Sequence, residues 1–235
     1  MKNIIEFKVY GRYGLFTDPI TKVGGEKFTY QLPTYQALKG ICESIYWKPT
    51  FQWVIDDVRV MNPIRTQSQG IRPINYNGGN SLSNYTYLMD VEYQVRAHFV
   101  WNFNRQDLSA DRNENKHYFV AKRMLERGGR RDIFLGTREC QGYVEPITFG
   151  EGKSFYDNYG EIEFDLMFFG FDYPSDTGEE KLKGKFWKPV MKNGIIHFDE
   201  EFAKDNIRLI KDMEYEIIQT NGLNEEGLLD GYKEE

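Results

Sequence analysis

The stretch that decides the fold is residues 88–101, Leu88-Met-Asp-Val-Glu-Tyr-Gln-Val-Arg-Ala-His-Phe-Val-Trp101. Apolar side chains at every second position alternate with four polar ones, Glu92, Gln94, Arg96 and His98. This period of two predicts a strand with one buried and one polar face. The other elements of the first domain are placed around this strand.

Three further elements are expected before it. Ile5, Phe7 and Val9 alternate with charged residues and predict a strand. Pro33-Thr34 is a helix-start signal and Pro49 ends the helix that follows. Residues 53–61 predict a second strand, whereas the glycine-rich residues 11–33 and the polar residues 62–84 are expected to be loops.

A helix and a closing strand or hairpin are expected after it. Asp111 and Glu114 have the spacing of a capping box, and Gly128-Gly129 is a C-terminal stop. Residues 133–144 predict the closing strand or hairpin. The order strand, helix, strand, strand, helix, strand is typical of α+β ferredoxin-like folds, which include the RNA recognition motif. The sequence therefore predicts such a domain over residues 1–147.

Residues 148–235 are expected to form a β-rich C-terminal region. Residues 162–171 predict a strand, and residues 186–191 and 195–198 flank Asn193-Gly194, a strong hairpin signal. These strands predict a small antiparallel sheet appended to the first domain. From Asp199 the chain is acidic, with one amphipathic stretch around Ile207.

Charge is distributed unevenly along the chain. The 235 residues carry a formal net charge of −6. Residues 199–235 hold 12 acidic and 4 basic residues, so residues 1–198 hold 24 acidic and 26 basic residues. Residues 112–131 alone contain seven bases and two acids. Because steering depends on the local field, the overall acidity does not exclude an anionic partner.

Several functional classes lack their sequence signals. The chain shows no signal peptide and no apolar run that could cross a bilayer, so a cytoplasmic protein without membrane contact is expected. Two cysteines and three widely spaced histidines provide no transition-metal motif. No phosphate-binding glycine loop or GxSxG elbow occurs. We therefore expect no metal and no cofactor.

The start of the second predicted helix is the best candidate for acid–base chemistry. His117 follows Lys116 in the first turns, where the helix N-terminus favours bound phosphate. At ~100° per residue, Lys116, Arg123 and Arg127 share one face. Yet His117 also borders the apolar stripe, where a lone histidine is more often a core residue. Tyr46, at the end of the first helix, has the same two interpretations, and the pattern alone favours packing.

Four segments carry a family resemblance. They are Phe16-Thr-Asp-Pro-Ile-Thr-Lys-Val23; Gly40-Ile-Cys-Glu-Ser-Ile-Tyr-Trp-Lys-Pro49 with Asn62-Pro-Ile64; residues 88–99; and Lys116-His-Tyr-Phe-Val-Ala-Lys-Arg-Met-Leu-Glu-Arg-Gly128 with Phe134-Leu-Gly-Thr-Arg-Glu139 and Val144-Glu-Pro146. Together they resemble the CRISPR-associated RAMP superfamily, and within it the family-five subunit of subtype I-C that processes precursor RNA. The match covers about two-thirds of the chain but is weak beyond residue 199.

The resemblance implies a metal-independent endoribonuclease. Such enzymes make the RNA 2′-OH attack the adjacent phosphate, which leaves a 2′,3′-cyclic phosphate and a 5′-OH. The family's catalytic Tyr, Lys and His fall on Tyr46, Lys116 and His117. Lys116 suits charge stabilisation, whereas the acid and base roles of Tyr46 and His117 stay open. Five arginines are candidates for binding the RNA backbone: Arg123, Arg127, Arg130, Arg131 and Arg138.

The resemblance also implies partners. The substrate would be a CRISPR repeat RNA cut beside its hairpin stem. The protein, expected to be monomeric by itself, would stay on the 5′ handle of the product, with the backbone and large subunits of the type I-C interference complex. One alternative is a scaffold subunit of that complex that binds RNA without cutting it. Another is an unrelated ferredoxin-like protein that binds acidic small molecules or another protein.

Overall fold

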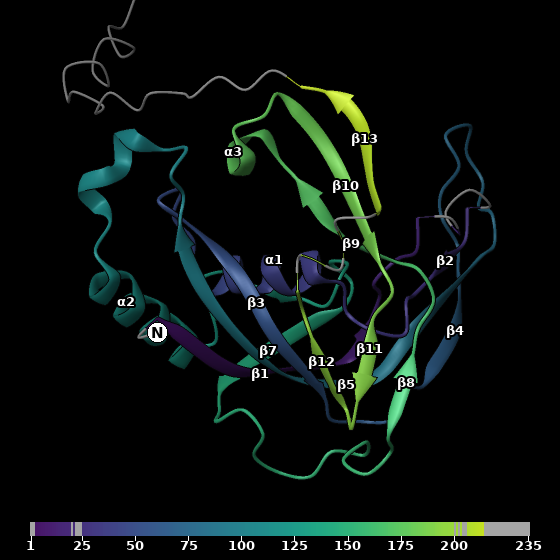
Figure 1. The fold of residues 1–235 in the computed structure, drawn as a ribbon. Coiled ribbons are helices and arrows are strands. Elements are labelled where there is room, and N and C mark those ends of the chain that lie inside the picture. The colour runs from purple at the N-terminus through teal and green to yellow at the C-terminus, as the bar shows by residue number, and fades with distance from the viewer. Residues whose placement is uncertain are drawn as a thin grey trace, which may run out of the picture.

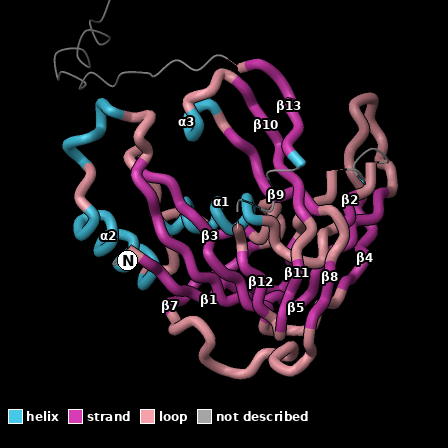
Figure 2. Tube along the Cα trace, viewed as in Figure 1, coloured by secondary structure: helices cyan, strands magenta, loops and turns pink. Residues whose placement is uncertain are grey.

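The computed structural model describes residues 3–19, 21, 25–199, 201, 203 and 206–213 (Figure 1). The elements in chain order are β1 Ile4–Gly14, β2 Lys27–Phe28, α1 Tyr35–Ile45, β3 Phe51–Val60, β4 Thr66–Ile71, β5 Ser83–Trp101, a 3₁₀ helix Gln106–Asp111, α2 Glu114–Glu126, β6 Ile133–Phe134, β7 Gln141–Pro146, β8 Glu161–Glu163, β9 Met167–Asp172, α3 Pro174–Thr177, β10 Lys181–Trp187, β11 Val190–Lys192, β12 Ile195–His197 and β13 Ile207–Asp212. Strands far outnumber helices among these elements (Figure 2).

The predicted strand over residues 88–101 is the centre of the main sheet. It forms the larger part of β5, which pairs antiparallel with β1 on one side and with β3 on the other. β7 pairs with the free side of β1, so the central order is β7-β1-β5-β3. This is the strand order of a ferredoxin-like domain with helices α1 and α2 as crossovers. The predicted α+β class is therefore confirmed.

The two long helices bury the apolar face of these strands. α1 packs against β3, and α2 packs against β1 and β7. The side chain of Thr34 accepts a hydrogen bond from the Ala37 N–H at 3.1 Å, which caps α1 as Pro33-Thr34 predicts. In α2 the prediction is off by two residues, because Asn113 and not Asp111 caps the helix. The Asp111 side chain is thereby available for other contacts.

Two predicted loops contain strands. β1 runs on to Gly14, and β4 lies inside the expected loop over residues 62–84, where it pairs with the first residues of β5. β4 lacks a buried face, because none of its residues is buried. β4 thus forms because it pairs with the long strand β5, and its own sequence shows no alternation of apolar and polar residues.

The C-terminal strands divide between two sheets. A small separate antiparallel sheet exists as predicted, but it consists of β9, β10 and β13. The predicted hairpin strands β11 and β12, together with β8, instead extend the main sheet beyond β3. The predicted strand over residues 162–171 is split accordingly into β8 and β9. Asn193 and Gly194, at φ of 48° and 82°, form the expected turn between β11 and β12. The domain boundary after residue 147 stays a prediction, and the acidic tail beyond residue 213 lies outside the described residues.

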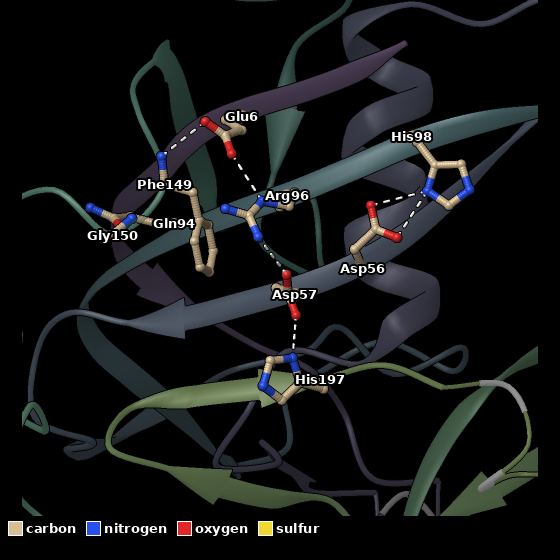
Figure 3. Close-up of polar contacts among 9 residues, drawn as sticks. All are labelled: Glu6, Asp56, Asp57, Gln94, Arg96, His98, Phe149, Gly150 and His197. Carbon is tan, nitrogen blue, oxygen red and sulfur yellow. Dashed lines mark hydrogen bonds and ion pairs between the residues drawn. The ribbon is translucent and has the colours of Figure 1, made fainter. Parts of the chain in front are cut away.

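A chain of ion pairs crosses the polar face of the main sheet (Figure 3). A β-bulge between Ile55 and Asp57 disrupts the side-chain alternation of β3, and Asp56 and Asp57 both find partners on this face. Asp56 accepts from His98 at 2.9 Å, and Asp57 pairs with Arg96 and His197. β12 is thereby attached to the centre of the sheet, and both histidines have carboxylate partners.

The buried guanidinium of Arg59 is expected to be a large source of stability. It is 5% exposed and bonds Gln94, Asp157 and the carbonyl oxygens of Glu151 and Gly152. Arg59→Met leaves these acceptors without their donor, so the free energy of unfolding should fall by about 2–4 kcal/mol. Urea denaturation measures this change.

Arg65→Met is the matched control, because the Arg65–Asp90 pair is more than half exposed on both sides. Its expected effect is only about 0–1 kcal/mol. Equal effects of the two substitutions would contradict the role given to Arg59.

Candidate functional site

Tyr46, Lys116 and His117 meet where the end of α1 faces the start of α2. The Tyr46 hydroxyl lies 2.9 Å from Nδ1 of His117, across 71 residues of chain. Tyr46 is held on both sides by its backbone: its N–H donates to the Cys42 carbonyl, and its own carbonyl accepts from Nε1 of Trp53 at 2.7 Å. These two backbone hydrogen bonds therefore fix the position of the Tyr46 phenol at the end of α1.

His117 is completely buried in an aromatic box. The rings of Tyr46, Phe51, Phe99 and Trp101 lie 5.3–6.4 Å from its imidazole, centre to centre. The prediction left open whether His117 is a core residue or a site residue. The structure shows a fully buried residue with a polar partner at each imidazole nitrogen, and its catalytic role stays a prediction.

The partners of His117 define its tautomer. Nε2 lies 2.8 Å from the main-chain carbonyl oxygen of Asp111, which can only accept a hydrogen bond. Nε2 of the neutral ring therefore carries the proton, and Nδ1 is an acceptor. It follows that the Tyr46 hydroxyl donates to Nδ1, and the phenol proton points at a base.

Sequence reasoning missed Asp111 and Thr50. The Asp111 carboxylate accepts from Thr50 Oγ1 at 2.7 Å, forms an ion pair with Nζ of Lys116, and lies 3.3 Å from Nε2 of His117. The capping-box spacing assigned Asp111 another role. Thr50 has no local signal at all, because its contact with Asp111 is made 61 residues away in the chain.

Burial and a nearby carboxylate keep the phenol of Tyr46 protonated. Burial raises the pKa of Tyr46, the Asp111 carboxylate raises it further, and the Arg130 guanidinium opposes the rise. Asp111 behaves differently: burial raises its pKa, but the hydrogen bonds from Lys116 and Thr50 outweigh this, and the pKa lies below its ordinary value. The site thus pairs a protonated phenol with a carboxylate.

Lys116 is the member of the site that reaches solvent. Its side chain is 54% exposed, whereas Tyr46 is 4% and His117 0% exposed. An ammonium has three donors, so the ion pair with Asp111 leaves others for a ligand. An incoming anion would therefore meet Lys116 first.

All five predicted RNA-binding arginines are exposed, but they lie in different places. Arg123 and Arg127 follow Lys116 along one face of α2. The main-chain N–H groups of Arg130 and Arg131 donate to the Ser44 carbonyl at the end of α1. This contact places both residues beside Tyr46.

Arg138 differs from the other four. It lies in the turn between β6 and β7, with its guanidinium over the Phe134 ring at 5.6 Å. Arg138 therefore contacts an aromatic ring and is not part of the basic face of α2 that contains Arg123 and Arg127.

Neither a metal cluster nor a membrane span is found in the part of the chain that the structure describes. No group of three or more His, Cys, Asp or Glu residues there is arranged to hold a metal ion. No helix among those residues has the length and apolar character needed to cross a bilayer.

Comparison with known proteins agrees with this architecture. The Cas_Cas5d family model, described as CRISPR-associated protein (Cas_Cas5), matches residues 4–199. A protein of Mannheimia succiniciproducens, named CRISPR pre-crRNA endoribonuclease Cas5d, is 27% identical over 231 residues, which cover 87% of this chain and 99% of that protein. A protein of the same name from Thermus thermophilus is 28% identical over 194 residues, 77% of this chain and 79% of that protein.

A solved structure described as that of a CRISPR-associated protein is similar over nearly its whole length. It has 38% sequence identity and a TM-score of 0.74, and the match covers 87% of this chain and 96% of that one. The family match takes in β1, both long helices and the β7 strand that closes the ferredoxin-like sheet. The chain therefore belongs to the CRISPR-associated Cas5 family, as a Cas5d subunit of subtype I-C.

Proposed function

We propose that this protein is a metal-independent endoribonuclease that cuts CRISPR precursor RNA within the repeat, beside the hairpin stem. The hydrogen bond between the Tyr46 hydroxyl and His117 Nδ1 carries this proposal. It aims a phenol proton at a base, next to the ammonium of Lys116. Two relatives that match most of the chain are named pre-crRNA endoribonucleases, which supports the same activity.

The reaction needs a route for the 2′ proton. The Tyr46 oxygen takes the proton from the RNA 2′-OH as its own proton passes to His117 Nδ1. The 2′ oxygen attacks phosphorus, and the bond from phosphorus to the 5′ oxygen breaks with its electron pair on that oxygen. The 5′ oxygen then takes a proton from a water molecule, and the hydroxide that remains takes the proton back from His117 through Tyr46, so that both side chains return to their starting state. The products are a 2′,3′-cyclic phosphate and a 5′-OH.

Two charges stabilise the transition state. The Lys116 ammonium compensates the extra negative charge that develops on the phosphorane. The Asp111 carboxylate, 3.3 Å from Nε2, compensates the positive charge that His117 gains. Because Tyr46 and His117 are buried, RNA reaches the phenol only when neighbouring side chains move. The same burial supports the alternative in which the protein binds RNA as a scaffold subunit without cutting it.

Cleavage of a labelled repeat RNA in EDTA tests the proposal. The parent protein should cut once and leave a cyclic phosphate, and a substrate with 2′-deoxy at the cut site should stay intact because it has no nucleophile. The deoxy RNA also serves as a binding control. If the protein binds the repeat but never cuts it, the scaffold function takes the place of catalysis.

The arginines on α2 are expected to control the salt dependence of RNA binding. Arg123→Ala and Arg127→Ala should each flatten the slope of log K against log salt by about 0.7–0.9, because each loses one phosphate contact. Filter binding at several salt concentrations measures the slope. Arg208→Ala in β13 is the matched control and should leave the slope unchanged. If all three variants have the same slope, the RNA does not bind along α2.

Retention in the complex completes the proposed function. The exposed face of α2 and the arginines after it would keep hold of the 5′ handle once the RNA is cut. The protein would then serve as a subunit of the type I-C interference complex, in contact with its backbone and large subunits. Co-purification of the cut RNA with this protein in the assembled complex tests this part.

A further inference from the structure

Asp111 connects the imidazole of His117 to two other polar side chains of the site. Its main-chain oxygen accepts from Nε2 of His117 at 2.8 Å and from the Asn113 N–H at 2.8 Å. Its carboxylate is held by Thr50 on one oxygen and by Lys116 on the other. One residue thus joins the start of β3 to the first turn of α2.

The carbonyl of Asp111 decides which nitrogen of His117 carries the proton. If that oxygen and the Asp111 carboxylate, 3.3 Å from Nε2, both moved away, Nε2 would lose its acceptors and the two neutral tautomers would compete. In the Nδ1–H tautomer the ring donates to Tyr46, so the phenol proton can no longer pass to the imidazole. The position of Asp111 therefore controls the direction of proton transfer.

The Asn113 N–H joins that carbonyl only to the start of α2, and the carboxylate is what joins it to the sheet. Asp111 ends the 3₁₀ helix, whose six residues are all outside the buried core and whose start has no side-chain cap. Thr50, by contrast, is 1% exposed and lies directly before β3. The bond of 2.7 Å between Thr50 Oγ1 and the carboxylate attaches this end of the 3₁₀ helix to the rigid sheet.

We infer that Asp111 is a positioning residue that, anchored by Thr50, keeps His117 in the Nε2–H tautomer and thereby lets it accept the proton of Tyr46. The inference rests on the proposed endoribonuclease function and adds to it the residue that sets the direction of proton transfer. Asp111 acts through His117 and does not contact the RNA that is cut.

Two measurements on the full-length protein test this role. Asp111→Ala should lower the single-turnover rate at saturating protein by about 10²-fold, the usual scale for a misplaced catalytic group, while the Kd for the repeat RNA does not rise. Asp111→Asn keeps an acceptor for Thr50 and should restore part of the rate. Thr50→Val removes only the anchoring hydroxyl and should give an intermediate loss.

Nitrogen-15 NMR of the imidazoles gives a readout that a merely structural residue would not move. The chain has only three histidines, so each ring signal can be assigned by substitution. We expect the Nε2–H tautomer for His117 in the parent and in Asp111→Asn, and a mixture of tautomers in Asp111→Ala. Asp107→Asn is the matched control, since this carboxylate of the same 3₁₀ helix pairs with Arg105 instead of a group in the site.

The outcomes separate this inference from the proposed function. Parental rates in both Asp111→Ala and Thr50→Val, or an unchanged tautomer in both, would overturn the positioning role. If Asp111→Ala does not fold, Thr50→Val decides alone. If the parent binds RNA without cutting it, the proposed function fails, and the tautomer measurement still decides whether Asp111 positions His117.

Discussion

Replacing His117 with asparagine should lower the single-turnover rate of repeat cleavage by about 10²–10⁴-fold, the usual contribution of a general base. An amide oxygen placed near Nδ1 can still accept from the Tyr46 hydroxyl, but it cannot take up the proton. RNA binding should persist, because His117 is fully buried and contacts no solvent. Gel-shift titration and quenched-flow cleavage on the same preparation measure both quantities.

The control for this variant is His98→Asn. His98 is also largely buried and has a carboxylate partner, but it lies on the polar face of the sheet. The same chemical change there should leave the cleavage rate at the parental value. If His98→Asn abolishes cutting and His117→Asn does not, the ion-pair chain in Figure 3 and not the aromatic box holds the active site.

Tyr46→Phe should lower the cleavage rate by about 10²-fold or more, because it removes the atom that passes the proton to His117. Burial raises the pKa of Tyr46, so the phenol stays protonated through the neutral range and hands on a proton instead of acting as a phenolate. The expected loss of stability is small, about 1 kcal/mol for one hydrogen bond. Thermal unfolding and cleavage assays distinguish the two effects.

Tyr156→Phe provides the matched comparison. Tyr156 is 5% exposed, and its hydroxyl accepts a hydrogen bond from the Ile64 N–H at 2.8 Å. Both substitutions therefore delete a hydrogen-bonded hydroxyl from a buried tyrosine, but only Tyr46 adjoins His117. If Tyr46→Phe cuts at the parental rate, the phenol takes no part in the reaction, and His117 has no proton-transfer route to the RNA.

Local patterns were sufficient for most of the fold. The alternation over residues 88–101 and the helix signals at Pro33-Thr34 are set by neighbours in the chain, so they can be read without the tertiary structure. β4 could not be read this way, because none of its residues is buried. The divergence of β8 from β9 was equally hidden, since no glycine or proline separates the two strands and their different pairing partners lie elsewhere in the chain.

The site residues were also only partly predictable from the sequence. The helix start at residues 116 and 117, and the phenol at the helix end, were predicted as candidates from spacing and resemblance. Their grouping in one site was implied by the resemblance, but the direct contact of Tyr46 with Nδ1 of His117 was not, because packing of α1 and α2 brings these residues together. The role of Asp111 was misread, since Asp111 and Asn113 are both residue types that favour the N-cap position and only the folded backbone decides between them.

By itself, the sequence determined the α+β class, the central strand, the family resemblance and the three residues proposed for catalysis. Each of these depends on residue type, on spacing within a segment and on the order of the segments along the chain. Only the tertiary structure decided that His117 is buried, that Nε2 faces a carbonyl and Nδ1 faces Tyr46, and that Thr50 anchors Asp111. The contacts of Tyr46 with His117 and of Thr50 with Asp111 join segments far apart in the chain, and they exist only once the hydrophobic core has packed the helices on the sheet.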